Sequence, residues 1–506
     1  MGRKLTVFYT SDCHGSFEAL SRCSASFAHG GNALVIDGGD TLHGSPLAYY
    51  LSRERNRTTK DSLFLPAQIM NSVGYDYVTL GNHDFSFGQE ILREYLSGLS
   101  AECLCANLSG MDPVRNVSVV TLENGLRVGV TGITSSMVPA MESPENLAGL
   151  KFSDAFSAAA EASAELREQH PDITVCVYHG GFEIPPEEYL LRKEKGYVLS
   201  EEPCLENQGL RIAEKLDYDI LLTAHQHNLF EGTRISGTYV CQLPSQCSGY
   251  IRLEAEERPA GEISVSGNYF SAENSMPDAK VKEILLPIKK DLQKWLDAEA
   301  GYLDADLIHN DYMDAAVNGS LLANFINQVQ IKASGADISC TALGNEQTGL
   351  PGRVTNGDVI RSYSFANTLA VIETGRAMLK AALERCAEYF VRDPDGKLKV
   401  SDAFLKPMVQ HFNYDYFSGI DYVIDTRRPL GDRVVSIKYN GLELSNSKKL
   451  TLCLNNYRAS GNGGYSFYRD AKTVSLINRE VQELIFDYIG SSGTVSVDRH
   501  RWATVI

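Results

Sequence analysis

Gly81-Asn82-His83-Asp84 comes directly after residues 77–80 (YVTL), a short apolar run that is typical of a β-strand. Two upstream motifs, DCH at 12–14 and GGD at 38–40, also follow apolar runs of this kind. All three motifs offer carboxylate, imidazole or amide groups, which are common metal ligands. Because the carboxyl ends of parallel strands meet at one edge of a sheet, the motifs predict a metal centre at that edge.

Two further strand-like runs end in histidines. Residues 174–178 (TVCVY) lead into His179, and residues 220–223 (ILLT) lead into His225 and His227. In open α/β sheets, ligands bind in the crevice outside the carboxyl ends of the strands. The candidate centre therefore contains Asp12, His14, Asp40, Asn82, His83, His179, His225 and His227.

This mixed ligand set is typical of a hydrolytic metal centre, because hard divalent cations favour oxygen and imidazole suits zinc, iron or manganese. Two ions about 3.5–4 Å apart need a bridging carboxylate, and we favour Asp40 for this role. Each motif also has an ordinary interpretation: His179 as a structural histidine, and Asn82 and Asp84 as turn residues. The occurrence of all five motifs in order, each at a strand end, favours the metal centre.

The composition is that of an acidic globular protein. Of 506 residues, 43% are hydrophobic and 22% are charged, and the formal net charge is −17. The length predicts two or three cores. The negative charge argues against nucleic-acid polymers and membranes as partners, because both are bound by basic surfaces. A small anionic substrate would need local positive charge, which divalent metals could supply; no protein partner is inferred.

We expect a soluble, cytoplasmic protein. The first residues enter a strand without the apolar stretch of a secretory signal, and no apolar run is long enough to span a membrane. Eleven cysteines, an odd number, are scattered through the expected strands and helices. This distribution favours reduced thiols over a disulfide framework.

Strand and helix patterns alternate from residue 5 to about 250, which predicts an α/β domain over residues 1–274 that contains the candidate metal centre. Residues 275–303 are expected to form an exposed connecting helix, interrupted by Pro287. Residues 304–506 mix the two patterns and predict a separate α+β domain. The expected helices are 18–29, 65–73, 88–97, 153–170, 205–215, 321–333 and 376–390, and further strands are expected at 250–253, 434–439 and 449–454.

The five motifs resemble the signature blocks of the calcineurin-like metallophosphoesterases. Their order and the two-domain length resemble the 5'-nucleotidase family, which includes UDP-sugar hydrolases and 2',3'-cyclic-nucleotide 2'-phosphodiesterase/3'-nucleotidases. The resemblance implies a four-layer α/β/β/α catalytic domain and a C-terminal domain that binds the nucleotide substrate.

Carried over to this sequence, the resemblance implies two divalent metal ions, which could be manganese, zinc, iron or cobalt. The first would be held by Asp12, His14, Asp40 and His227, and the second by Asp40, Asn82, His179 and His225. The metals would activate the attacking water and neutralise charge on the phosphoryl group. His83 would contact the phosphate or protonate the leaving oxygen.

The resemblance also implies that two aromatic rings stack on the base of the substrate. Tyr414, with Phe412 as second choice, falls where the first ring is expected, and Tyr457 where the second is expected. Alternatively, these aromatic residues pack a hydrophobic core. Arg353 and Arg361 are further candidates for substrate contacts.

Three departures bear on the substrate. The 5'-nucleotidase branch has an aspartate that supports the catalytic histidine where this chain has Ser86, an arginine in the segment corresponding to 344–349, and an aspartate where Gly463 stands. The differences favour a 2',3'-cyclic-nucleotide 2'-phosphodiesterase/3'-nucleotidase. The alternatives are a 5'-nucleotidase or UDP-sugar hydrolase and, from another class, a non-catalytic metal or nucleotide sensor.

Overall fold

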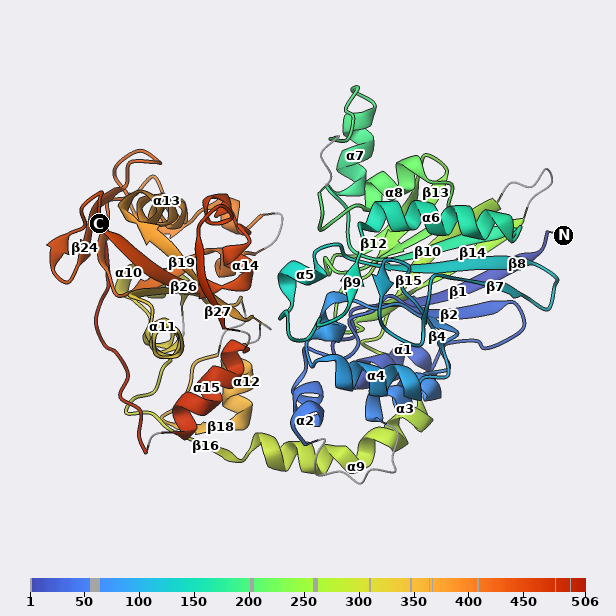
Figure 1. Cartoon of the computed structure of the whole chain (residues 1–506), viewed down its shortest axis with the longest axis horizontal. Helices are drawn as coiled ribbons and strands as arrows, with labels where there is room; N and C mark the ends of the chain where they lie inside the picture. Colours follow the sequence, from blue (N-terminus) through green and yellow to red (C-terminus); the bar gives the residue numbers. More distant parts are fainter. Residues whose placement is uncertain are drawn as a thin grey trace. The chain divides into compact units, whose positions relative to one another are not determined.

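The computed structural model describes residues 2–54, 64–200, 204–257, 263–308, 311–345, 348–363, 365, 367–406, 409–477, 479–491 and 493–506. The chain divides into two compact units, Met1–Leu292 and Gln293–Ile506 (Figure 1). No helix in the described parts of the chain is long and apolar enough to cross a membrane.

The first unit contains two large sheets. The seven-stranded sheet has the order β15-β14-β1-β2-β3-β4-β6, and the six-stranded sheet has the order β12-β13-β11-β10-β8-β7. The strands of the first sheet are β1 (Lys4–Thr10), β2 (Ala33–Asp37), β3 (Tyr77–Val78), β4 (Glu102–Leu104), β6 (Val114–Arg115), β14 (Gly249–Glu257) and β15 (Ile263–Ser271). Those of the second are β7 (Val117–Thr121), β8 (Arg127–Thr134), β10 (Ile173–His179), β11 (Ile220–Thr223), β12 (Phe230–Ile235) and β13 (Thr238–Gln242).

The two sheets stack face to face. Along β1, Val7 and Tyr9 belong to a core that also contains Val175 of β10, whereas Phe8 packs into a core on the opposite face of its sheet. Successive strand residues point to opposite faces, so both faces of β1 are buried. The outer core of the first sheet includes Leu20 from a helix, and this sheet is therefore covered on its outer side.

Helices form the two outer layers (Figure 1). The helices α1 (Phe17–Ser24), α3 (Leu65–Val73) and α4 (Gln89–Gly98) contribute to the outer core of the first sheet, and α6 (Ala155–Glu168) and α8 (Gly209–Lys215) contribute to that of the second. The predicted α/β/β/α architecture is confirmed. Helices α1 and α8 are shorter than predicted, and the strand predicted at 250–253 extends to Glu257 and pairs with β15.

The connecting helix is shorter than the predicted segment 275–303. Helix α9 spans Ala279–Leu296 and continues through Pro287, while Glu299–Tyr302 forms strand β16, which pairs with β18 (Arg353–Thr355). Pro287 lies on the exposed side of the helix, where water can satisfy the carbonyl freed by the missing N–H. The division between the two units falls inside α9.

The second unit is an α+β fold. Its five-stranded sheet has the order β22-β17-β26-β19-β27, with helix α11 (Leu321–Ser334) on one side and α13 (Arg376–Ala387) on the other (Figure 1). The strands are β17 (Ile338–Ala342), β19 (Leu369–Gly375), β22 (Asp415–Ser418), β26 (Lys449–Asn455) and β27 (Thr473–Ile477). Both predicted helices are confirmed, although α13 ends at Ala387 rather than Phe390.

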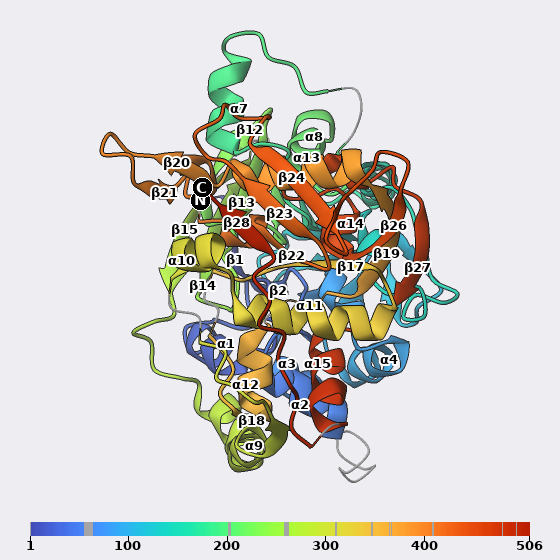
Figure 2. The ribbon, with the colours of Figure 1, turned by 90° about the vertical axis from the view of Figure 1, so that its left-hand side faces the viewer.

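A second, four-stranded sheet completes this unit. It has the order β25-β24-β23-β28, and Figure 2 shows its last three strands beside one another. The strands are β23 (Asp421–Ile424), β24 (Val434–Tyr439), β25 (Leu442–Glu443) and β28 (Ala503–Val505). The strands predicted at 434–439 and 449–454 correspond to β24 and β26 and are confirmed.

Candidate metal centre

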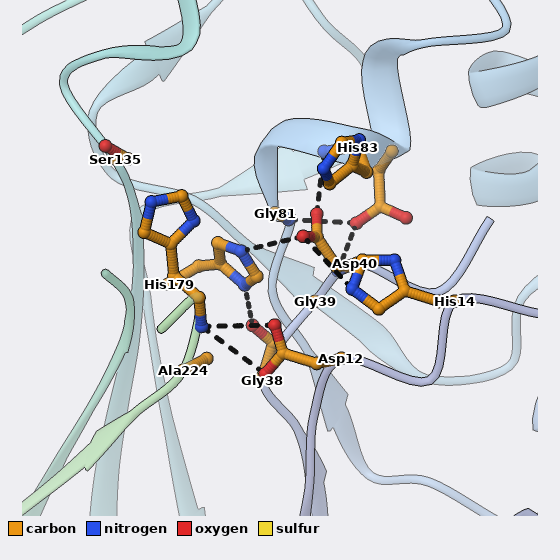
Figure 3. A network of polar contacts seen from close by, with 12 residues as sticks. Asp12, His14, Gly38, Gly39, Asp40, Gly81, His83, Ser135, His179 and Ala224 are labelled. Atoms are coloured by element: carbon orange, nitrogen blue, oxygen red, sulfur yellow. Dashed lines mark hydrogen bonds and ion pairs between the residues drawn. The ribbon is translucent and has the colours of Figure 1, made fainter. Parts of the chain in front are cut away.

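Five strand ends bring the predicted residues together, and they come from two sheets rather than from one sheet edge. β1, β2 and β3 belong to the first sheet, whereas β10 and β11 belong to the second. Figure 3 shows Asp12, His14, Asp40, His83 and His179 with their polar groups directed toward one another. The centre therefore lies where the carboxyl ends of both sheets meet.

The backbone is strained at this point. Asp12, His14, Asp40, His225 and His227 all have positive φ angles, between 50° and 72°. Residues other than glycine adopt this conformation at an energetic cost, and such residues cluster at functional sites. The surrounding fold must stabilise the three loops that carry these residues to keep the side chains converged.

The side chains form two adjoining groups. Asp12, His14 and His227 offer ligand atoms within 4.8 Å of one another, and Asp40, His179 and His225 do the same. Asp40 Oδ2 lies 3.2 Å from His179 Nε2 and 3.9 Å from His14 Nε2. It thus lies near an imidazole of each group, which is the arrangement that a bridging carboxylate requires.

On the proposed ligands, three buried polar atoms make no hydrogen bond to any described residue: Asp40 Oδ2, Asn82 Oδ1 and His179 Nε2, of which the first and the last form an ion pair at 3.2 Å. Buried polar atoms are nearly always satisfied, because leaving one without a partner is costly. A divalent cation would satisfy all three, since carboxylate, amide oxygen and imidazole are suitable ligands. The residues present therefore fit a metal ion.

Backbone carbonyls orient two of the imidazoles. His14 Nδ1 lies 2.7 Å from the carbonyl oxygen of His43, and His179 Nδ1 lies 2.7 Å from that of Gly38. With Nδ1 as the donor, the lone pair is at Nε2, which faces the centre. The sequence did not single out His43 or Gly38 for this role, because a carbonyl acceptor leaves no signature in residue type.

The charges in the centre are strongly coupled. Burial would raise the pKa of Asp40, but His179, His83 and His14 around it lower that pKa well below its ordinary value. Burial likewise opposes the charge on His179, but Asp40 raises the pKa of this imidazole. Asp40 is therefore an ionised carboxylate, as a metal ligand must be.

Asp84 holds two of the loops together. Its carboxylate accepts hydrogen bonds from the backbone N–H groups of Asp40 (2.9 Å), Thr41 (2.8 Å), Leu42 (3.0 Å) and Gly81 (2.9 Å). Of the two residues that could have been ordinary turn residues, Asp84 thus has a structural role, whereas the side-chain oxygen of Asn82 has no hydrogen-bond partner among the described residues.

His83 lies beside the two groups. Its backbone N–H donates to Asp40 Oδ1 (2.7 Å), and its ring lies between those of His14 and His43, with centroids 5.3 Å and 5.5 Å away. Burial lowers the pKa of His83 to about 3, so the imidazole is neutral at neutral pH. The hydroxyl of Ser86 donates to Glu142 Oε1 (2.8 Å).

In the second unit, the structure contradicts the prediction that Tyr414 contacts a base. Its side chain is only 2% exposed and packs in the core, where its hydroxyl donates to the carbonyl of Ala316 (3.3 Å). Phe412 is half-buried and Tyr457 is 38% exposed. Of the three predicted aromatic contacts, only these two are accessible in this unit.

A buried arginine that sequence reasoning missed connects the two accessible rings. Arg458 donates to Asp415 through Nη2 (2.8 Å) and Nε (3.0 Å), and through Nη2 to the carbonyl of Phe412 (2.9 Å). Its guanidinium lies 5.7 Å from the ring centre of Tyr457. Arg458 therefore ties the two segments that carry Phe412 and Tyr457.

Arg458 also accounts for the departure at Gly463. This glycine has a φ of +69°, and a Cβ there would overlap Arg458 Nη1 and Asn413 Oδ1. An aspartate would not fit beside the buried guanidinium. Segment 344–349 is the second departure that falls in this unit. Its residues 346 and 347 lie outside the described residues.

The two predicted arginines are exposed and paired locally. Arg353 Nε lies 3.2 Å from Glu299, and Arg361 Nη2 lies 2.7 Å from Asp358. Their contact with a substrate stays a prediction.

Comparison with known proteins identifies both parts of the chain. Residues 5–229 match the family model for calcineurin-like phosphoesterase, and residues 301–470 match that for the 5'-nucleotidase C-terminal domain. The solved structure of a provisionally assigned 5'-nucleotidase from Staphylococcus aureus is 30% identical, with a TM-score of 0.82 over 99% of this chain and 100% of that one. The chain therefore belongs to the calcineurin-like phosphoesterases that carry a 5'-nucleotidase C-terminal domain, and it is a metal-dependent phosphoester hydrolase.

More distant relatives have several activities. The 2',3'-cyclic-nucleotide 2'-phosphodiesterase/3'-nucleotidase of Haemophilus influenzae is 22% identical over 95% of this chain and 80% of that protein. The trifunctional nucleotide phosphoesterase protein of Bacillus subtilis is 23% identical over 92% of this chain, which spans only 35% of the Bacillus protein.

Proposed function

We propose that this enzyme hydrolyses phosphate esters of nucleotides at a centre of two divalent metal ions. The first ion would be held by Asp12, His14, Asp40 and His227, and the second by Asp40, Asn82, His179 and His225. The observation that carries the proposal is the set of three buried ligand atoms, on Asp40, Asn82 and His179, that make no hydrogen bond to any described residue. Residues 1–274 would form the catalytic domain, 275–303 the connection, and 304–506 the substrate-binding domain.

When bound, the metals would supply an activated water and positive charge for the phosphoryl group. The chain's own residues would orient the reacting groups. Asp40 would face both ions, and its Oδ1 holds the backbone of His83 (2.7 Å). The His83 imidazole would hydrogen-bond the phosphate or, once the negative charge of the bound phosphate has raised its pKa, give a proton to the leaving oxygen.

In the second unit, Phe412 and Tyr457 would hold the base between their rings. Stacking on aromatic rings binds any base, because every base has a π-face. The partial exposure of both rings and the anchoring of their segments by Arg458 support this assignment. Tyr414 is replaced by Phe412 as the first ring.

Among nucleotides, we favour 2',3'-cyclic and 3'-phosphate esters. Ser86, which replaces the aspartate of the 5'-nucleotidase branch, supports this preference, as does the relative from Haemophilus influenzae. A 5'-nucleotidase or UDP-sugar hydrolase is the second candidate, and the relative from Staphylococcus aureus favours it.

A substrate panel tests the proposal. The manganese-loaded protein would be assayed with 2'-AMP, 3'-AMP, 5'-AMP, 2',3'-cyclic AMP and UDP-glucose. We expect the cyclic and 3' substrates to be hydrolysed fastest, whereas faster hydrolysis of 5'-AMP or UDP-glucose would support the second candidate. Hydrolysis of none of them would contradict a nucleotide substrate, and tight manganese or nucleotide binding without turnover would support a sensor.

We also propose that the protein works in a reducing compartment such as the cytoplasm. All eleven cysteines are free thiols, and ten of them are buried, which is typical of proteins kept reduced. Fractionation of the native cells would test this location, and recovery of the protein outside the cytoplasm would contradict it.

A further inference from the structure

Glu206 lies beside one of the histidines of the candidate metal centre. Its Oε1 is 3.2 Å from His225 Nε2. The two residues are far enough apart in sequence that no motif marks Glu206. Neither the five signature motifs nor the proposed ligand set includes it.

The contact determines which nitrogen of His225 is available to a metal. In this contact the carboxylate oxygen of Glu206 accepts, so Nε2 of His225 carries the proton and Nδ1 carries the lone pair. His14 and His179 have the opposite arrangement, because their Nδ1 atoms face backbone carbonyls. In His225 it is therefore Nδ1, not Nε2, that is available to a metal. A carboxylate rather than a backbone carbonyl orients this ring.

The segment that carries Glu206 is anchored beside His179. The backbone carbonyl of Glu206 accepts hydrogen bonds from Tyr178 Oη (3.2 Å) and Ser135 Oγ (3.3 Å). The next residue, Asn207, accepts from the backbone N–H of Gly181 (2.9 Å). These bonds attach the segment to the end of β10, so that the carboxylate is positioned before any ligand arrives.

We infer that Glu206 is a positioning residue for the second metal: it fixes the tautomer and orientation of His225 and makes Nδ1 a stronger ligand. A carboxylate on the outer nitrogen of a metal-bound histidine raises its basicity, and loss of such a partner typically weakens metal binding about 10- to 100-fold. The inference rests on the proposed two-metal function, because it concerns the ion that His225 would hold.

The test is to titrate the metal-free full chain with manganese and to measure the heat of binding by isothermal titration calorimetry. We expect two equivalents in the wild type, and in Glu206→Ala one equivalent weakened about 10- to 100-fold while the other is unchanged. Glu206→Gln keeps an oxygen acceptor without the charge and should fall between the two. Glu168→Ala, at an exposed glutamate on α6, is the matched control and should bind like the wild type.

The outcomes separate the two claims. If the wild type binds two equivalents and both Glu206 variants bind both within twofold of it, the role of Glu206 is overturned while the metal centre stands. If the wild type binds no manganese, zinc or cobalt, the proposed function itself fails. Thermal unfolding of the metal-free proteins checks that the variants are folded, and equal midpoints would assign any loss to metal binding.

Discussion

At the scale of single residues, His83 is the side chain of the centre whose role is catalytic rather than ligating in our proposal. Its ring contacts His14 and His43, and its Nδ1 has no hydrogen-bond partner among the described residues. A substrate phosphate would provide one. The imidazole can therefore be removed without removing any proposed metal ligand.

We predict that His83→Ala lowers turnover about 100-fold or more, which is the usual contribution of a general acid or base. Metal content, measured by elemental analysis, should match that of the wild type, and His29→Ala, at an exposed histidine, should change neither quantity. A variant with normal turnover would remove His83 from the mechanism.

Among the aromatic residues of the second unit, some substitutions should affect substrate binding and others the stability of the fold. Tyr457→Ala and Phe412→Ala should each raise KM, because each variant loses one stacked ring that contributes about 1–3 kcal/mol to base binding. The free energy of unfolding of both variants should change little. Tyr414→Ala should instead destabilise the fold by about 3–5 kcal/mol, because it empties a core position. Kinetics and denaturant unfolding of the three variants would check this, and an unchanged KM in Tyr457→Ala would contradict base stacking there.

The buried carboxyl group of Asp37, at the end of β2, should make the free energy of unfolding depend on pH. Burial raises its pKa to about 7, although hydrogen bonds from Thr10, Gly39 and Thr41 oppose this. The unfolded pKa is about 3.9, so between these values the folded chain holds a proton that the unfolded chain has lost. The contribution of Asp37 to the free energy of unfolding should therefore fall as pH rises from about 4 to 7, by about 4 kcal/mol in total.

The measurement is denaturant unfolding of the metal-free protein across this pH range. Asp37→Asn cannot ionise, so its stability relative to the wild type should improve steadily as the pH rises. A constant difference between the two proteins would show that Asp37 has an ordinary pKa.

At the scale of elements, the loops after β2 and β3 must approach closely for the centre to form. Gly81 allows this approach, because a Cβ at this position would overlap Asp40 Oδ1 and His179 Cε1. Asp84 then ties both loops through four backbone N–H groups. The positions of the ligands Asp40 and His179 thus depend on Gly81, which is not itself a ligand.

We predict that Gly81→Ala displaces Asp40 and His179 and removes at least one bound metal ion from a folded protein. Metal analysis and circular dichroism would measure the two effects, and Gly493→Ala, where a Cβ would meet no atom within 4 Å and φ is not positive, controls for the loss of a glycine. Full metal content in Gly81→Ala would contradict the close approach.

At the scale of the whole molecule, the two units have separate hydrophobic cores. One core is built only from residues of the second unit, whereas three others belong to the first. All the proposed metal ligands belong to the first unit. A ligand stabilises the structure that binds it, by about 2.7 kcal/mol per site at a free concentration 100 times its Kd.

Calorimetric unfolding with and without manganese should therefore show two transitions, of which manganese raises only one. Limited proteolysis and the metal-binding variant Asp40→Ala would assign that transition to the first unit. A single transition that moves as a whole would contradict the separate stability of the two units.

The strand-end motifs, the α/β alternation and the two-part organisation could be predicted from the sequence. These features depend on local patterns. An apolar run of strand length followed by a polar residue predicts a strand with a polar group at its end, wherever that strand lies in the fold. Five such runs were enough to name the six residues of the two ligand groups, although all were expected at one sheet edge.

Tertiary structure alone decided the rest, because contacts between distant residues leave no local pattern. Stacking of two sheets brought His179 and His225 to Asp40, and core packing buried Tyr414 while leaving Tyr457 accessible. The partners Glu206 and Arg458 could not be predicted, since a carboxylate or a guanidinium is ordinary until the fold places it against a histidine or an aspartate. The sequence by itself thus determined the chemistry at the strand ends, and only the tertiary structure decided how those groups are oriented.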